Sequence, residues 1–468
     1  MIGTKTWLLL LLCCCALAGP VPTSTTTYIP TTDIGIFLES TTGVPASWRV
    51  RGWVQEPNVR GSFEILWTCL VTIFLCTHSM LILNMAAPND TQWAIARRRV
   101  LWMAIAILGP EFPLTFAAGQ WSRACQSVMA FKSLRGRWTM RHAFFADMGG
   151  FVLCPRDSKP FPLNTKQLLW LVVNKKVERP LVTAEELWDR SKQTRLVRIV
   201  MSVQTGYFVV QCIARVQQGL AVTTLELNTL AIVVCSLITN MVWLHKPSEV
   251  SIPIRITTPF SSEELCGCQQ WQLTPLDFVD ENGPGYSVNI QPFMGMPVIS
   301  PERPIQRIPN DRFPTDPHGC QEYFLCFATL VFTAVHVAGW RIGFPSRIEE
   351  ALWRTSSLLL FGITAAFWIL ETIASWVRLG RWEHLYLRLF AKGRLPDFER
   401  RQLRKRETAD TKPRAPLPQP WEFWTITPLA VIYGIARLYL IVEAFLEFRN
   451  MPASAFLNVR WSAYIPHA

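Results

Sequence analysis

The chain has 468 residues, of which 50% are hydrophobic, and a mean hydropathy of +0.20. Its 20 Trp residues are typical of proteins whose indole rings lie at membrane interfaces. The net charge of +12 indicates either nucleic acid or an anionic membrane surface as a partner. The basic residues lie between apolar stretches, which favours the anionic cytoplasmic leaflet of a bilayer and argues against nucleic acid.

Residues 1–18 have the pattern of a secretory signal peptide. Lys5 precedes a short apolar run, and the small residues Ala16 and Ala18 follow at the spacing of a cleavage site. The run is too short to cross a bilayer, which needs about 20 residues. An uncleaved anchor is the alternative. Cleavage would place the Ser/Thr/Pro-rich leader 19–61 on the lumenal or extracellular side.

A broken apolar stretch, Val100–Ala118, is interrupted at Gly109-Pro110 and again at Pro113, with Glu111 inside the break. Prolines remove backbone donors, so the stretch is either a kinked span or a re-entrant hairpin. Six other stretches are long and apolar enough to cross a bilayer, namely Ile65–Leu83, Ile199–Val216, Leu225–Leu244, Tyr323–Trp340, Leu358–Val377 and Phe423–Leu446.

Charge indicates the orientation of these spans. Segment 119–197 has 14 Lys/Arg against 6 Asp/Glu, and segment 378–422 has 12 against 6. Short basic loops prefer the cytoplasm. Both segments can be cytoplasmic, with a lumenal leader, only if Val100–Ala118 does not cross. We therefore predict an all-α polytopic bundle with six full spans, one broken or re-entrant helix and both termini outside. Seven spans with a cytoplasmic N-terminus are the alternative.

This topology divides the chain into nine segments. The cytoplasmic ones carry distinct signals: capping-box spacings at Asn164 and Thr183, a proline-rich loop expected to be extended or loosely ordered, and a basic amphipathic stretch suited to the anionic leaflet. The segments are 1–18 (signal), 19–61 (leader), 62–118 (first span and broken helix), 119–197 (basic region), 198–244 (hairpin), 245–320 (proline-rich loop), 321–377 (hairpin), 378–422 (basic loop) and 423–468 (last span and tail).

Ionisable residues inside a bilayer are costly and usually face a partner or a water-filled cavity. Arg215 and Glu226 flank a short turn between two spans, so we expect them to pair or to share a polar network. His336 and Arg437 lie at comparable depth if their spans are antiparallel neighbours, and Glu371 lies on a polar stripe of the fifth span. Such residues either line a functional cavity or hold the helices together.

Outside the spans, His142 and Asp147 lie beside a Gly-Gly turn. They are candidates for an acid/base site that faces a headgroup or a diphosphate; local backbone capping is the alternative. Asn89 begins the sequon Asn-Asp-Thr, which would be glycosylated only in the seven-span topology. Weak candidates for zinc ligands occur in one predicted loop, although the spacing within each pair is irregular; they are Cys266, Cys268, His318 and Cys320.

Several segments together resemble one family. Residues 52–61 read GWVQEPNVRG, residues 142–151 read HAFFADMGGF, and residues 461–467 read WSAYIPH. In combination these are similar to a family of fungal polytopic integral membrane proteins of unassigned function. The resemblance covers nearly the whole mature chain, and it implies an association with secondary-metabolite pathways.

The chain has no phosphate-binding loop, dinucleotide fingerprint, HExxH or GxSxG motif, so we predict no cofactor. The first hypothesis is an accessory, scaffold or receptor-like membrane component of the secretory pathway, in the endoplasmic reticulum, vacuolar or plasma membrane, with cytoplasmic loops suited to protein partners. The second is a membrane-embedded enzyme, such as a cyclase or transferase, on an isoprenoid or lipid. The third is a small-molecule transporter. The catalytic candidates would be Asp147, His142, Glu226, Arg215, His336, Glu371 and Arg437.

Overall fold

A computed structural model describes most of the chain between residue 48 and residue 464, and the signal and most of the leader lie outside the described residues. Most of the proline-rich loop beyond residue 280 and nearly all of the basic loop also lie outside them, so the predicted amphipathic anchor is not described. The described residues are 27–29, 48–56, 59–79, 81–134, 137–191, 195–266, 271, 273–279, 302–310, 320–379 and 420–464.

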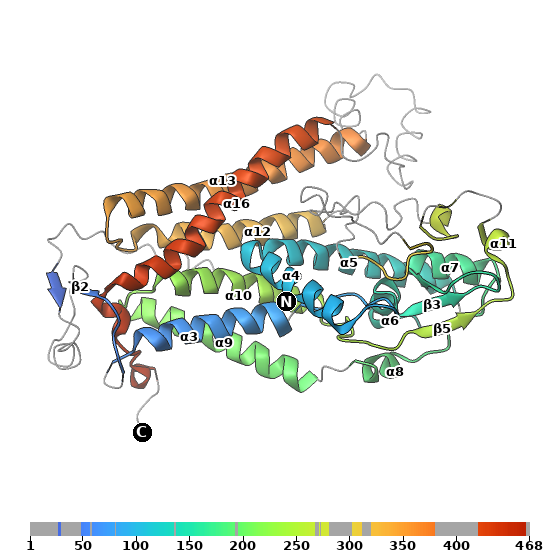
Figure 1. The fold of residues 1–468 in the computed structure, drawn as a ribbon, viewed down its shortest axis with the longest axis horizontal. Helices are drawn as coiled ribbons and strands as arrows, with labels where there is room; N and C mark the ends of the chain where they lie inside the picture. The colour runs from blue at the N-terminus through green and yellow to red at the C-terminus, as the bar shows by residue number, and fades with distance from the viewer. Residues whose placement is uncertain are drawn as a thin grey trace, which may run out of the picture.

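Helices dominate the described residues (Figure 1). They are α3 (Ser62–Phe74), continued by the π-helical turn η1 (Leu75–Ser79), α4 (Gln92–Leu108), α5 (Glu111–Ala130), α6 (Met140–Asp147), α7 (Thr165–Val173), α8 (Ala184–Asp189), α9 (Arg195–Gln217), α10 (Thr224–Val242), α11 (Ser262–Cys266), α12 (Cys320–Ala338), α13 (Arg347–Leu379) and α16 (Pro420–Leu446). Short 3-10 turns are η2 (Phe131–Ser133), η3 (Asp277–Val279), η5 (Gly339–Arg341), η6 (Glu447–Arg449), η7 (Ala453–Phe456) and η8 (Trp461–Ala463).

The expectation of a purely helical fold is wrong in one respect, because two small sheets are present. One has the order β1-β2-β6, with β1 (Thr27–Ile29) parallel and β6 (Asn450–Pro452) antiparallel to β2 (Trp48–Arg51). The other has the order β4-β3-β5, with β4 (Phe161–Leu163) antiparallel and β5 (Ile254–Thr257) parallel to β3 (Phe151–Cys154). Each sheet joins segments that are far apart in the sequence.

The bundle is organised around α10. This helix is apolar on nearly every face, and a helix of that kind is stable only when other elements surround it. It packs against α3, α5, α9, α12 and α16. Its side chains Leu227, Ala231, Val233 and Cys235 are fully buried in the main hydrophobic core. The polar residues that α10 carries must therefore find their partners on neighbouring helices.

One end of the bundle, which we call the terminal end, contains β2, β6, η7 and the α9–α10 and α12–α13 turns. Arg49 of β2 donates from Nη1 to the carbonyl oxygen of Gly343, 2.6 Å away, which places the α12–α13 turn there. Gly219 has φ +70° at the end of α9, and the amide of Leu220 donates to the Arg215 carbonyl at 2.8 Å. This Schellman closure ends α9 and turns the chain into α10.

The opposite end, the domain end, is a compact α/β domain that contains β3–β5, α6–α8 and α11 (Figure 1). Its core includes Phe151, Leu153, Phe161 and Leu168. Residue Phe151 of β3 pairs with Ile254 of β5, so segments 119–197 and 245–320 meet in one sheet. Residues 245–266 and 302–310, which we expected to be extended or loosely ordered, are instead part of this domain or packed on it.

The broken stretch forms two helices, α4 and α5, whose axes differ by 109°. The first turns of α4 lie at the domain end, where Arg99 forms an ion pair of 2.6 Å with Glu249. The last turn of α5 leads into Phe131. Its ring stacks on that of Trp138 in the domain core, with 4.1 Å between the ring centroids. Both outer ends of the pair therefore lie at the same end of the bundle, as in a re-entrant hairpin.

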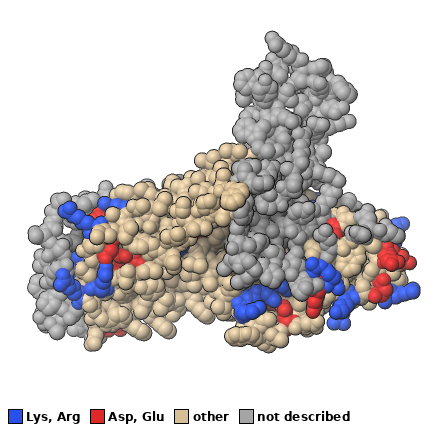
Figure 2. Space-filling view, turned by 45° about the horizontal axis from the view of Figure 1, so that its top comes forward, with Lys and Arg blue, Asp and Glu red and all other residues tan. Residues whose placement is uncertain are grey.

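Among the described residues, four helices are long and apolar enough to cross a membrane, or five if the bent pair counts as one; the four are Ile199–Gln217, Thr224–Val242, Arg347–Ile373 and Trp424–Arg449. Two shorter apolar helices accompany them, Ser62–His78 and Tyr323–Ala338. Charged side chains gather at the two ends of the face in Figure 2, with a broad uncharged surface between them. The chain is thus compatible with a multi-pass membrane protein, but six or seven spans are not confirmed by length and composition.

Candidate functional site at the helix break

Arg437 of α16 closes the broken end of α4. The last carbonyl groups of a helix have no partner within it. Arg437 donates from Nε to the Leu108 carbonyl oxygen at 3.2 Å and from Nη2 to the Ile107 carbonyl oxygen at 3.3 Å. Because the C-terminus of a helix carries a partial negative charge, the fully buried guanidinium also complements the dipole of α4.

The same guanidinium joins α16 to α10 and α12. Its Nη1 donates to Oδ1 of Asn228 at 3.0 Å and lies 2.5 Å from Nε2 of His336. An arginine only donates, so Nε2 of His336 must be the acceptor, and the imidazole is neutral with its proton on Nδ1. That proton faces the Phe332 carbonyl oxygen at 3.3 Å. The predicted neighbourhood of His336 and Arg437 is therefore a direct contact.

Asn228 is the centre of this network. Its Nδ2 donates to the carbonyl oxygen of Thr224 at 3.0 Å and to that of Leu440 at 3.1 Å, while its Oδ1 accepts from Arg437. It is 3% exposed. All the hydrogen-bonding groups of its amide are used, so Asn228 fixes the spacing of α10 and α16. It is an uncharged residue on an apolar helix and was not among the sequence candidates.

Glu111 lies at the first position of α5, beside this network. Its Oε1 accepts a hydrogen bond of 2.5 Å from the hydroxyl group of Tyr433 on α16. The residue is half-buried, but its Oε2 is covered and has no hydrogen-bond partner among the described residues. A carboxylate at the N-terminus of a helix is favoured by the helix dipole. The break between α4 and α5 thus places an acid, a phenol, a guanidinium and an imidazole in one buried region.

Arg215 and Glu226, which we expected to pair or to share a polar network, both lie at the terminal end but form no direct ion pair with each other. Glu226 pairs with Arg60, whose Nη2 lies 2.7 Å from its Oε1. Burial alone would lower the pKa of Arg60, but the Glu226 carboxylate raises it above its ordinary value, so Arg60 stays charged. The guanidinium of Arg215 instead donates to the backbone carbonyl oxygens of Ala221, Ser454, Ala455 and Leu457.

A capping box explains the second role of Glu226. Its Oε2 accepts from the amide of Thr223 at 2.9 Å, and its own amide donates to the Thr223 hydroxyl at 3.1 Å. The sequence signal, Thr followed three residues later by Glu, was present but was not used. The capping boxes predicted at Asn164 and Thr183 are confirmed.

His142 and Asp147 lie on α6 and fasten the α/β domain. His142 Nδ1 accepts from the amide of Thr139 at 3.3 Å, and Nε2 donates to the Val182 carbonyl oxygen at 2.8 Å. Asp147 accepts from the amide and hydroxyl of Thr165, at 3.0 and 2.8 Å, at the start of α7. The structure therefore gives His142 and Asp147 different partners.

Those of the remaining candidates that the structure describes form no second site. Glu371 is half-buried on α13 and does not enter the contacts around Arg437 given above. Asn89 is exposed in the turn before α4. Among the described residues no three His, Cys, Asp or Glu side chains are grouped to hold a metal ion. Cys266 is buried, whereas Cys268, His318 and the side chain of Cys320 lie outside the description, so the zinc prediction stays a prediction.

Lys246 is a functional candidate that the sequence did not reveal. It is 1% exposed, and Nζ donates to the Ile82 carbonyl oxygen at 2.8 Å, to Gln120 Oε1 at 2.8 Å and to Asn84 Oδ1 at 3.2 Å. It also lies 4.6 Å from the ring centroid of Trp243. In the sequence, Lys246 lies in His-Lys-Pro directly after an apolar span. A lysine at such a position is usually exposed, so the sequence did not indicate its burial.

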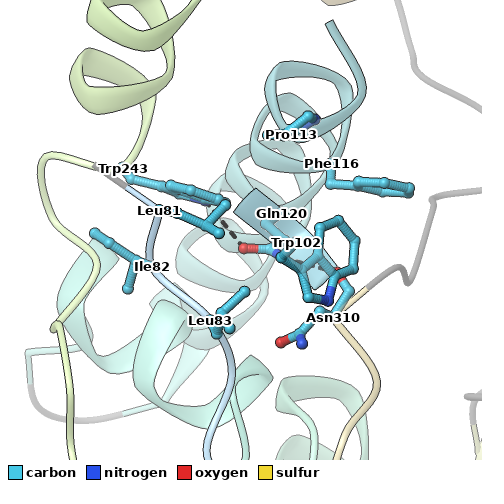
Figure 3. A pocket seen from close by; sticks show the side chains of 9 residues that line it. All are labelled: Leu81, Ile82, Leu83, Trp102, Pro113, Phe116, Gln120, Trp243 and Asn310. Atoms are coloured by element: carbon cyan, nitrogen blue, oxygen red, sulfur yellow. Dashed lines mark hydrogen bonds between the residues drawn. The ribbon is translucent and has the colours of Figure 1, made fainter. Parts of the chain in front are cut away.

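A small cavity lies beside Lys246 (Figure 3). The dashed line in the figure is the hydrogen bond that Nε1 of Trp243 donates to Oε1 of Gln120 at 3.0 Å. The volume of the cavity is about 10 Å³, which is roughly enough for one water molecule. Its walls are mostly apolar, with Leu81, Ile82, Leu83, Trp102, Pro113, Phe116, Gln120, Trp243 and Asn310 as the lining residues. Gln120 and Asn310 are already in contact beside it, because Nε2 of Gln120 donates to the Asn310 carbonyl oxygen at 3.4 Å.

The fold and these sites define a helical protein with several membrane-length apolar helices and a folded α/β domain. The chain belongs to a family described as a family of unknown function (DUF8562), whose model matches residues 33–266 and 321–468. The matched residues include Glu111, His336 and Arg437, whereas Cys268, His318 and Cys320 lie in the unmatched segment. Comparison with curated proteins and with solved structures finds no match.

Proposed function

We propose that this chain is a multi-pass membrane protein with six crossing helices and one re-entrant pair. The crossing helices are α3, α9, α10, α12, α13 and α16, and both termini face the lumen or the exterior. The pairing of β3 with β5 supports a common side for segments 119–197 and 245–320. The pairing of β2 with β6 supports a common side for the two termini. The basic surplus of segment 119–197 favours the cytoplasm for the domain end.

Within that membrane the protein acts as an accessory, scaffold or receptor-like component. The observation that carries this proposal is the use of the buried charges. The hydrogen bonds of Arg215 go to four backbone carbonyl groups, Glu226 caps α10 and pairs with Arg60, and His142 uses both ring nitrogens. Groups that are committed in this way hold helices and tails together. The link to a fungal secondary-metabolite pathway rests on the sequence resemblance.

A membrane-embedded enzyme on an isoprenoid or lipid is the second candidate, and a small-molecule transporter would use the same residues. The observation that favours both is the helix break, where Glu111 and Tyr433 lie beside Arg437 and His336. Residues of this kind in a bilayer mark substrate, ion or proton pathways. Catalysis by these groups would need a substrate that reaches Glu111 from the bundle surface.

Metabolite and lipid profiling of a deletion strain tests these proposals. The strain is complemented with the wild type, Glu111→Gln and Glu226→Gln, and the amount of membrane-inserted protein is measured in each. For an accessory component, any compound lost on deletion returns in proportion to the inserted protein for both variants. If Glu111→Gln inserts normally but fails to restore the compound while its precursor accumulates, the enzyme replaces the accessory component as the better proposal.

A further inference from the structure

We propose that the Glu111 carboxyl group is an exchangeable proton-binding site inside the bundle, at the break between α4 and α5. Protonation forms one O–H bond on Oε2 and removes the carboxylate charge, and the proton comes from hydronium of the aqueous phase, which becomes water. This site goes beyond an accessory or receptor-like role, because it gives the bundle a chemical signal that it can sense. It does not depend on catalysis at the same position.

The two oxygens of Glu111 have unequal surroundings. Oε1 accepts the hydroxyl proton of Tyr433 at 2.5 Å, and Oε2 is covered by protein without a donor among the described residues. A buried carboxylate that lacks donors is costly, so it either gains a partner or becomes neutral. Oε2 is therefore the atom on which a proton would reside.

Arg437 favours the charged form without neutralising it directly. The contacts of its guanidinium are with Leu108, Ile107, Asn228 and His336, so it acts on Glu111 through space rather than through a bonded ion pair. Burial opposes the charge, while the Tyr433 hydroxyl group, the backbone amide of Glu111 itself and Arg437 favour it. Because these contributions oppose one another, a change in any one of them shifts the balance between the two protonation states of the carboxyl group.

None of the other titratable groups described below competes with Glu111 for the exchanging proton. His336 on α12 accepts from Arg437, and protonating it would put a second cation against the guanidinium. Cys235 on α10 is a fully buried thiol, and the hydroxyl group of Tyr433 already donates a hydrogen bond to Glu111. Phe112 is 37% exposed and Leu108 is 48% exposed, so the side chains beside the buried carboxyl group reach the bundle surface.

Infrared difference spectroscopy of the full chain in lipid nanodiscs tests this proposal. Spectra are recorded from about pH 5 to about pH 9, a range that covers buried carboxyl groups. We expect a carboxylic C=O band that titrates within this range, disappears in Glu111→Gln and remains in Glu443→Gln, a matched variant of a glutamate on α16. The proposal is overturned if no titrating band is lost in Glu111→Gln, or if the band is constant across the range.

Tyr433→Phe provides a second test that does not depend on the folding of Glu111→Gln. Removing the donor destabilises the carboxylate, so the midpoint of the band should move up by about one pH unit. Tyr439→Phe is the control, because its hydroxyl donates to Glu443 at 3.2 Å on the same helix, and it should leave the midpoint unchanged. An unchanged or lower midpoint in Tyr433→Phe contradicts the proposal.

Discussion

Arg437 donates from Nε to the carbonyl oxygen of Leu108, 3.2 Å away, and so a side chain of the last helix closes a helix that was broken more than 300 residues earlier. The two prolines at residues 110 and 113 leave the end of α4 without a continuing helix. An exposed carbonyl at membrane depth would cost free energy, and the guanidinium removes that cost. The bent pair α4–α5 therefore depends on α16.

Replacing Arg437 should destabilise the bundle. Arg437→Leu leaves the α4 carbonyls and Asn228 without their donor, and we expect a loss of about 3 kcal/mol in the free energy of unfolding. Thermal unfolding of the detergent-purified protein measures the effect. The control is Arg354→Ala, because Arg354 pairs with Glu350 on the surface of α13, where a salt bridge contributes about 1 kcal/mol or less. Equal shifts for both variants would show that Arg437 is not a structural cap.

A double-mutant cycle tests the ion pair at the terminal end. Arg60→Gln and Glu226→Gln each leave one buried charge without its partner, so each should cost about 3 kcal/mol. The double variant removes both charges of the pair and should cost less than the sum of the two. Arg215→Gln, combined with Glu226→Gln, serves as the comparison pair. Additive effects of Arg60 and Glu226 would contradict the direct pair seen in the structure.

The α/β domain should lose stability in acid through His142. Burial lowers the pKa of His142, and the nearby Arg179 and Arg141 lower it further, against the opposing hydrogen bond to Val182. The folded state therefore binds this proton less tightly than the unfolded state, whose histidine has the ordinary value of 6.5. The stabilisation by neutral His142 is complete above that value and is lost as the pH falls below it.

The unfolding temperature at several pH values measures this effect. The wild type should become less stable between about pH 7.5 and about pH 5.5, and His142→Gln should show a smaller decrease over the same interval. The variant keeps an amide that can donate to the Val182 carbonyl, so its stability at the higher pH serves as the reference. An identical decrease in both proteins would assign the acid sensitivity to other groups.

The helical spans and caps were readable from the sequence because they depend on local patterns. Apolar runs of membrane length predicted α9, α10, α13 and α16, and the Gly109-Pro110 pair predicted the break between α4 and α5. Capping boxes need only four residues, and those at Asn164 and Thr183 were predicted correctly. The Gly-Gly turn after α6 is also local: Gly149 has φ +91°, and the amide of Gly150 closes the helix on Phe145 at 2.8 Å.

The sheets and the pairing of charges were not readable, because they depend on contacts between distant segments. Strands of three or four residues are too short to show an alternating pattern. The partner of Glu226 is Arg60, which belongs to the leader region rather than to a span, so a search for partners inside the spans could not find it. Lys246 was missed because the acceptors given above are uncharged oxygens from two segments of the chain, residues 82–84 and helix α5.

Glycosylation mapping tests the central claim, that the bent pair α4–α5 returns to the side from which it entered. The natural sequon at Asn89, an acceptor inserted after Lys159 in the α/β domain and an acceptor appended after the last residue are compared in microsomal membranes. We predict modification of the appended acceptor alone, since the proposed topology places the domain end and Asn89 on the cytoplasmic side. Modification of Asn89 with an unmodified acceptor after Lys159 would show that the pair crosses the membrane, and would contradict the six-helix topology.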